Sequence, residues 1–133
     1  MASVAGLLAL LSLFRIAVPK SSRVDKRIKI GRPGSFPLND FTYLPEHKIY
    51  VYRDNAGMQA VSSNCTHLGC AIEKTSKGFQ CPCHGSIYNT KGSVISGPAL
   101  KDLSWYRLYR SPDGQVIVDM TRGVDPDFRL RTN

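Results

Sequence analysis

The sequence predicts an all-β protein: an antiparallel sandwich-like base with a small metal-binding subdomain inserted at one end, preceded by an N-terminal apolar helix. Two stretches, residues 47–62 and 104–119, alternate apolar and polar residues around a polar turn, which is typical of β-hairpins. All four cysteines and two of the three histidines fall between residues 65 and 84. A chain of 133 residues has room for one domain and a small appendage.

Residues 1–18 are almost wholly apolar or small, and Arg15 is the one charge among them. A helix of this length spans about 27 Å, close to the roughly 30 Å hydrocarbon core of a bilayer. We therefore expect a transmembrane anchor helix. An export signal is a weaker alternative, because the run lacks a basic n-region and an Ala-x-Ala cleavage site. A buried soluble helix is weaker still, because so little chain is left to cover it.

Residues 19–35 have the composition of a hinge or linker, with Pro19 at the start and several Ser, Gly and basic residues after it. Much of the net charge of +8 lies in this segment. A basic run beside an apolar run favours a membrane-surface flank. Nucleic acid is not an expected partner, because no aromatic platform or helix–turn–helix pattern accompanies the charge. Residues 28–30 alternate and are predicted to begin the head domain, which continues to residue 133.

The cysteines and histidines sit in two loops that follow predicted strands. The hairpin at 47–62 leads into residues 65–70, Cys-Thr-His-Leu-Gly-Cys. A Lys-Gly turn at 77–78 leads through a short strand into residues 81–88, Cys-Pro-Cys-His-Gly-Ser-Ile-Tyr. The third histidine, His47, lies between two charged residues and receives no ligand role. Two thiolates and two imidazoles bind zinc as a tetrahedral site, or an iron–sulfur cluster in which two histidines replace two cysteines on one iron.

These paired motifs resemble the Rieske iron–sulfur protein of cytochrome bc complexes. The resemblance is most specific over residues 65–88 and looser from about residue 28 to the C-terminus. It implies a Rieske-type sandwich with a rubredoxin-like cluster-binding subdomain at about residues 63–98. It also implies one 2Fe–2S cluster per chain. The implied ligands are Cys65 and Cys81 on one iron, and His67 and His84 on the other.

The resemblance assigns roles to further residues of the two loops. It implies a disulfide between Cys70 and Cys83, which places the domain in an oxidising, extracytoplasmic compartment. Ser86 and Tyr88 match hydroxyl residues that hydrogen-bond a bridging sulfide and a ligand thiolate. Because such hydrogen bonds raise the potential, we expect a value in the upper part of the Rieske range. Residues 97–98, Gly-Pro, are expected to shield a third side of the cluster.

The function implied by the resemblance is electron transfer within a quinol–cytochrome c oxidoreductase, in which this chain is a subunit and not a complete enzyme. The cluster accepts one electron from quinol, while His67 or His84 takes a proton and acts at the catalytic tip. The electron then passes to a c-type cytochrome. The expected partners are a cytochrome b subunit, that cytochrome, the quinol and the membrane. A loop containing Leu68 and the Gly-Pro loop would form the apolar docking face. The resemblance implies that the head swings on its linker, whereas the composition of the linker fits a static extended tether equally well.

The order of apolar and positively charged residues in the N-terminal segment opposes an extracytoplasmic position of the head. Positive residues follow the apolar run, which favours a cytoplasmic head, whereas the family places the head on the extracytoplasmic side. Bacterial relatives carry a twin-arginine signal before the apolar stretch, and residues 1–18 contain none. We therefore expect a longer precursor, or a chain that has lost its leader.

Three other functions compete with the quinol interpretation. The first is the small Rieske subunit of a periplasmic molybdenum oxidase, such as arsenite oxidase. A Rieske ferredoxin of a ring-hydroxylating dioxygenase is disfavoured, because such ferredoxins lack the second cysteine pair. A zinc-stabilised binding domain belongs to a different class and would be colourless. Residues 121–133 are expected to lie loosely on the surface or to contact a partner.

Overall fold

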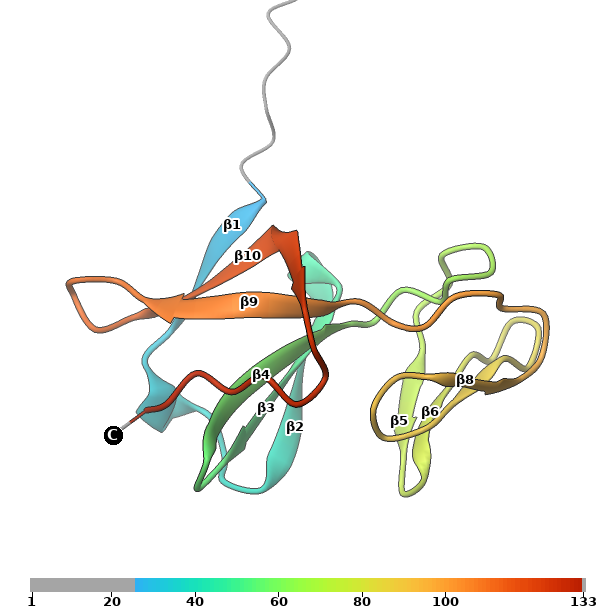
Figure 1. The fold of residues 1–133 in the computed structure, drawn as a ribbon, viewed down its shortest axis with the longest axis horizontal. Helices are drawn as coiled ribbons and strands as arrows, with labels where there is room; N and C mark the ends of the chain where they lie inside the picture. The colour runs from blue at the N-terminus through green and yellow to red at the C-terminus, as the bar shows by residue number, and fades with distance from the viewer. Residues whose placement is uncertain (1–25, 133) are drawn as a thin grey trace, which may run out of the picture.

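The computed structural model of the protein describes residues 26–132, which form two antiparallel sheets (Figure 1). The larger sheet has the strand order β1-β10-β9-β4-β3-β2, and the smaller has the order β5-β6-β7-β8. The strands are β1 (Arg27–Gly31), β2 (Asp40–Leu44), β3 (Ile49–Asp54), β4 (Gly57–Ser62), β5 (Glu73–Thr75), β6 (Gly78–Gln80), β7 (Ile87–Tyr88), β8 (Val94–Ser96), β9 (Trp105–Arg110) and β10 (Val116–Val124). The predicted all-β class is confirmed.

Short helical turns are the other regular elements within residues 26–132. They are the 3-10 helices η1 (Pro33–Ser35) and η2 (Pro45–His47), each opened by a proline. No helix within residues 26–132 has the length and apolar character needed to cross a bilayer. The anchor predicted over residues 1–18 lies outside the described residues.

Both predicted hairpins are confirmed. In the first, β3 pairs with β4 from Ile49 opposite Ser62 to Asp54 opposite Gly57. The Asp54 carboxylate accepts hydrogen bonds from the backbone N–H groups of Ala56 and Gly57, at 2.8 and 2.9 Å, and so closes the turn. In the second, β9 pairs with β10. Both hairpins bury apolar residues in the core. β10, the second strand of the second hairpin, extends beyond residue 119, where the predicted strand ended.

The domain begins within the segment predicted as linker. The predicted strand at residues 28–30 is confirmed as part of β1, which pairs with β10 from Arg27 opposite Asp119. Ile28 and Ile30 pack against the core of the larger sheet. This later part of residues 19–35 therefore belongs to the folded head, while residues 19–25 lie outside the described residues.

The smaller sheet stands beside the larger one, at the right of Figure 1, and an apolar cluster joins the two. Tyr50 and Val61 enter this cluster from the larger sheet, and Phe79 and Tyr88 enter it from the smaller sheet. Trp105 is buried in the same cluster, as predicted for a core residue, and its indole N–H donates to the Lys91 carbonyl at 2.7 Å. The two loops that contain the cysteines and histidines are therefore attached to a shared hydrophobic base.

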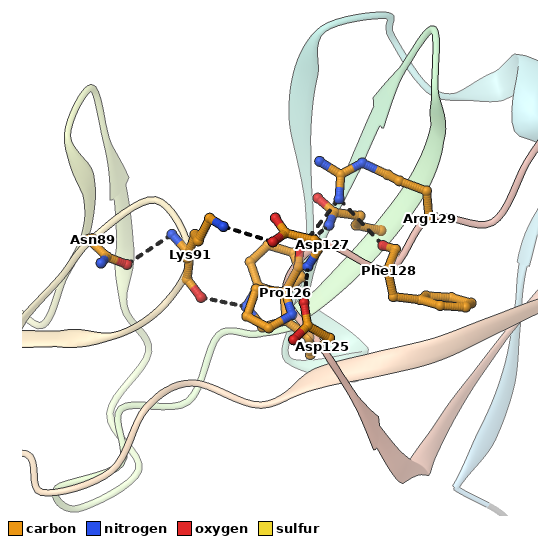
Figure 2. Close-up of polar contacts among 9 residues, drawn as sticks. Asn89, Lys91, Asp125, Pro126, Asp127, Phe128 and Arg129 are labelled. Atoms are coloured by element: carbon orange, nitrogen blue, oxygen red, sulfur yellow. Dashed lines mark hydrogen bonds and ion pairs between the residues drawn. The ribbon is translucent and has the colours of Figure 1, made fainter.

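The C-terminal tail is docked, so the expectation of a loose tail is wrong. Leu130 pairs with Met58 through two backbone hydrogen bonds of 2.9 Å. Figure 2 shows the tail facing the loop of the smaller sheet, where Lys91 forms an ion pair of 2.8 Å with Asp127. Phe128 packs against the core of the larger sheet. β4 pairs with β9 at only two residues, Ala60 and Val61. The tail therefore gives β4 additional backbone pairing at Met58.

Candidate metal centre

The two cysteine- and histidine-containing loops share one backbone design. In the first, Cys65 N–H donates to the Cys70 carbonyl (2.7 Å), and Gly69 N–H donates to the Cys65 carbonyl (2.8 Å). In the second, Cys81 N–H donates to the Ser86 carbonyl (2.8 Å), and Gly85 N–H donates to the Cys81 carbonyl (3.0 Å). The fifth residue of each loop is a glycine with a φ of 80° or 75°, the left-handed region that glycine adopts without strain. The sequence pattern thus gives two matching turns.

The predicted donor side chains of the two loops differ in their exposure to solvent. The thiols of Cys65 and Cys81 are free and buried, at 3% and 2% exposure. The imidazoles of His67 and His84 meet edge to face, with ring centroids 5.1 Å apart. His67 is half-buried and His84 is exposed. The cysteines therefore lie on the core side of the site, and the histidines lie on the solvent side.

A disulfide joins the two loops. It links Cys70 to Cys83, the pair that the resemblance implies. The sulfurs of Cys70, Cys81 and Cys83 all lie within 4.8 Å of one another, which is close enough for a shared metal ion. Two of these sulfurs share the disulfide and provide no thiolate, so Cys81 is the one thiol of this trio that can bind a metal.

Tyr88 is the centre of the hydrogen-bond network beneath the first loop. Its hydroxyl lies 3.3 Å from the Cys65 sulfur and 3.0 Å from Thr66 Oγ1, and it accepts a hydrogen bond from the Thr66 backbone N–H at 3.1 Å. Thr66 Oγ1 donates to the Lys101 carbonyl at 2.5 Å. The Tyr88 proton is then available to Cys65, and a charged thiolate is the stronger acceptor.

This network acts on the acidity of both groups. Burial raises the pKa of the Cys65 thiol, but hydrogen bonds from Tyr88, the His67 backbone, Cys81 and Ser86 outweigh burial, so the pKa is lowered from its ordinary value. Burial and the hydrogen bond to Cys65 raise the pKa of the Tyr88 phenol. Cys65 is thus prepared to act as a thiolate, and Tyr88 is kept as a neutral donor.

Ser86 is completely buried beneath the second loop. Its Oγ accepts a hydrogen bond of 3.1 Å from the Ala99 backbone N–H. Gly97 lies directly against it, because a Cβ built on Gly97 would stand 2.5 Å from the Ser86 Cα. The Gly-Pro segment predicted to shield the site therefore packs on the backbone of the second loop.

The sequence did not reveal every residue of this network. Thr66 received no role, although its hydroxyl ties the first loop to Lys101, 35 residues further along the chain. Its place between two motif residues was the available signal. Two large apolar side chains in these segments are exposed, Leu68 of the first loop at 71% and Leu100, between Ala99 and Lys101, at 93%. His47, which received no ligand role, lies in η2 beside β3 of the larger sheet.

The donor set fits the cluster that the resemblance implies. The two loops carry two buried thiols and two imidazoles in contact with each other, of which His67 is half-buried and His84 is exposed. A cluster in which two histidines replace two cysteines on one iron requires two thiolates and two imidazoles as its ligands. Buried hydroxyl groups of Ser86 and Tyr88 adjoin the thiol side. A closed zinc site, in contrast, has no need of an exposed pair of imidazoles.

Comparison with known proteins supports the same assignment. The iron–sulfur subunit of the cytochrome b6-f complex of Chlorobaculum tepidum is 30% identical over 80% of this chain and 61% of its own length. The corresponding subunit of Gloeobacter violaceus is 42% identical over 56% of this chain and 38% of its own length. The chain spans about half the length of the curated relatives that it matches.

A solved structure and a family profile complete the comparison. A chain of a hyperthermophilic respiratory Complex III aligns with a TM-score of 0.53 and 24% identity, covering 85% of this chain and 91% of that chain, which supports the fold. The profile described as "Rieske [2Fe-2S] domain" matches residues 27–107, the larger part of the chain, and includes both loops. The protein therefore belongs to the Rieske family, whose cofactor is a 2Fe–2S cluster.

Proposed function

We propose that this protein is the electron-transfer subunit of a quinol–cytochrome c-type oxidoreductase, anchored in a membrane by its N-terminal segment with the head on the extracytoplasmic side. The paired imidazoles at an exposed tip are the observation that carries the proposal, because a quinol oxidant needs an accessible group that takes a proton. The names of the relatives, iron–sulfur subunits of cytochrome b6-f complexes, support it. A cytochrome b subunit and a c-type cytochrome are the proposed partners.

The proposed ligands are Cys65 and Cys81 on one iron, and His67 and His84 on the other. The cluster supplies a one-electron acceptor, and its two neutral ligands make it easier to reduce than an all-cysteine cluster. The ring nitrogen of His67 or His84 that faces away from the thiols takes the quinol proton. Leu68 and Leu100 provide an exposed apolar rim that excludes water when the tip docks. Ser86 and Tyr88 stabilise negative charge on the thiol side.

A redox titration of the full-length protein, followed by electron paramagnetic resonance at several pH values, tests the function. We expect a Rieske-type signal and a high midpoint that falls with rising pH, by up to about 59 mV per unit for one proton per electron. Reduced protein should also transfer its electron to a c-type cytochrome. A low midpoint that does not depend on pH near neutrality would contradict a ubiquinol-like role and favour a dioxygenase-type ferredoxin or a protein that oxidises menaquinol. Stoichiometric zinc without the signal would exclude the cluster.

A molybdenum-oxidase subunit is the second candidate, because such small subunits also carry the disulfide found here. Co-purification separates the two. A cytochrome b subunit recovered with the full-length chain supports the quinol role, whereas a molybdenum-containing subunit supports the alternative.

Replacing Tyr88 by Phe is expected to lower the midpoint potential without loss of the cluster. The phenol donates a hydrogen bond to the Cys65 sulfur and draws negative charge away from the cluster. Its removal therefore destabilises the reduced state, which carries one more negative charge than the oxidised state. A hydrogen bond that is stronger by 1 kcal/mol in the reduced state corresponds to about 40 mV for one electron. The measurement is the redox titration.

The matched control for this variant is Tyr50→Phe. Tyr50 lies in the same apolar cluster, but its hydroxyl donates to the Ile72 carbonyl at 3.0 Å and not to a sulfur. Its potential should stay at the wild-type value. Equal potentials in the two variants would show that the Tyr88 hydroxyl does not tune the site.

A further inference from the structure

The free thiol of Cys81 lies beside the disulfide. The sulfurs of Cys70, Cys81 and Cys83 are within 4.8 Å of one another, and Cys65 is not part of this group. Cys70 and Cys83 form the disulfide, whereas Cys81 is free and buried. A thiolate at this position has a disulfide within reach, and thiolates attack disulfides directly.

We propose that iron bound at Cys81 protects the disulfide, and that loss of the cluster lets Cys81 attack it and re-pair the cysteines. This inference rests on the proposed function, in which Cys81 is a cluster ligand. A sulfur bound to iron has its reactive electron pair engaged, so the exchange starts only when the iron leaves. The re-paired chain no longer offers Cys65 and Cys81 together as thiols, so it cannot rebuild the site.

The exchange needs no oxidant. The Cys81 sulfur loses its proton and forms a bond to the Cys70 sulfur, while the bond between Cys70 and Cys83 breaks. The electron pair of the broken bond stays on the Cys83 sulfur, which takes up the proton. One disulfide is lost and one is formed, so the number of free thiols per chain does not change.

The expected product is the bond between Cys70 and Cys81. The alternative, Cys81 to Cys83, would close a tight ring that contains only Pro82 between its cysteines, and disulfide geometry is restrictive. The favoured product also keeps the two loops linked, because Cys70 belongs to the first loop and Cys81 to the second. It moves the free thiol from a buried position to Cys83, which is exposed.

This change of exposure makes the exchange measurable. The full-length protein in detergent is divided into a cluster-loaded sample and a sample stripped of iron by a chelator without oxygen. Both are incubated for about a day, which is long compared with the minutes to hours of uncatalysed rearrangement. A short pulse of N-ethylmaleimide, followed by peptide mapping without reduction, then identifies the free thiols. We expect labelling of Cys83 to rise at least several-fold in the stripped sample and to stay at background in the loaded sample.

Two single variants provide the matched comparison, because neither has the complete ligand set and each retains one free thiol. In Cys65→Ser the attacking thiol remains, so label should appear at Cys83. In Cys81→Ser the attacking thiol is absent, so label should stay at Cys65. Near-ultraviolet circular dichroism checks that both variants keep the fold. A rate that does not depend on protein concentration assigns the reaction to one chain.

Each outcome of the mapping decides the inference. Label confined to Cys65 and Cys81 in the stripped sample would overturn it, as would equal exchange in the loaded sample. Label at Cys70 would support exchange but overturn the choice of product. A freshly purified protein without a cluster signal would instead contradict the proposed function, and this result is obtained from the spectrum before any thiol is mapped.

Discussion

Replacing His84 by Ala is expected to abolish the cluster, so that the purified protein loses its red-brown colour and its Rieske-type resonance. The imidazole is one of two that meet edge to face. In the proposed ligand set, its removal leaves one iron with a single protein nitrogen. Loss of a residue that only supports a ligand already costs about 10–100-fold in metal affinity, and loss of a ligand costs more. Iron and sulfide per chain, measured together with the resonance, should fall below about a tenth of the wild-type content.

The fold should survive this change. His84 is exposed, and the apolar cluster beneath the loops does not include it. The matched control is His47→Ala, which removes a histidine from η2 on the larger sheet. The control should keep wild-type iron content and signal. An H84A protein with a normal cluster would remove His84 from the ligand set, and an H47A protein without one would show that the proposed ligands are incomplete.

The parts of the fold that the sequence predicted depend on local patterns. Alternation and turn residues locate β3 with β4 and β9 with β10, because neighbouring strands pair through a short turn. The strands of the smaller sheet were largely missed. β7 has two residues and β8 has three, too few to show a period, and their pairing depends on contacts across the subdomain.

The tail shows why a polar composition misleads. Phe128 and Leu130 are isolated apolar residues in a charged segment, which is typical of a solvated end. The structure docks them because β4 pairs with β9 only near its middle and leaves Met58 open to another partner. That opening is a property of the whole sheet, and no local pattern reports it.

The candidate donors lie in two short loops, so their spacing is visible in the sequence. The structure joins these loops by the predicted disulfide and brings the two imidazoles into contact, and the ligand set itself stays a prediction. The contacts that position the loops are different, because they join distant residues. The bond from Thr66 to the Lys101 carbonyl and the bond from Ala99 to Ser86 depend on the final packing.

The second large effect is expected from Gly97→Ala. Gly97 has a φ of +93°, and a Cβ there would stand 2.5 Å from the Ser86 Cα and 2.9 Å from its backbone nitrogen. Both contacts are with backbone, so the Gly-Pro segment must move away, and Ala99 then loses its hydrogen bond to Ser86 Oγ. Left-handed strain costs about 1–2 kcal/mol, and a forced shift costs about 1–3 kcal/mol more. We expect unfolding and cluster loss at a clearly lower temperature, measured by visible absorbance at one scan rate.

Gly69→Ala separates the two causes of this loss. Gly69 lies in the other loop with a similar φ of +80°, but nothing stands within 4 Å of a Cβ placed there. Gly69→Ala should therefore lower the unfolding temperature through backbone strain alone. The further decrease of the unfolding temperature in Gly97→Ala measures how firmly the Gly-Pro segment packs on Ser86. Equal decreases of the unfolding temperature in the two variants would mean that the Gly-Pro segment moves aside without a free-energy cost and does not shield the site. A larger decrease in Gly97→Ala, with faster bleaching of the cluster by a chelator, would identify this contact as the cover on that side.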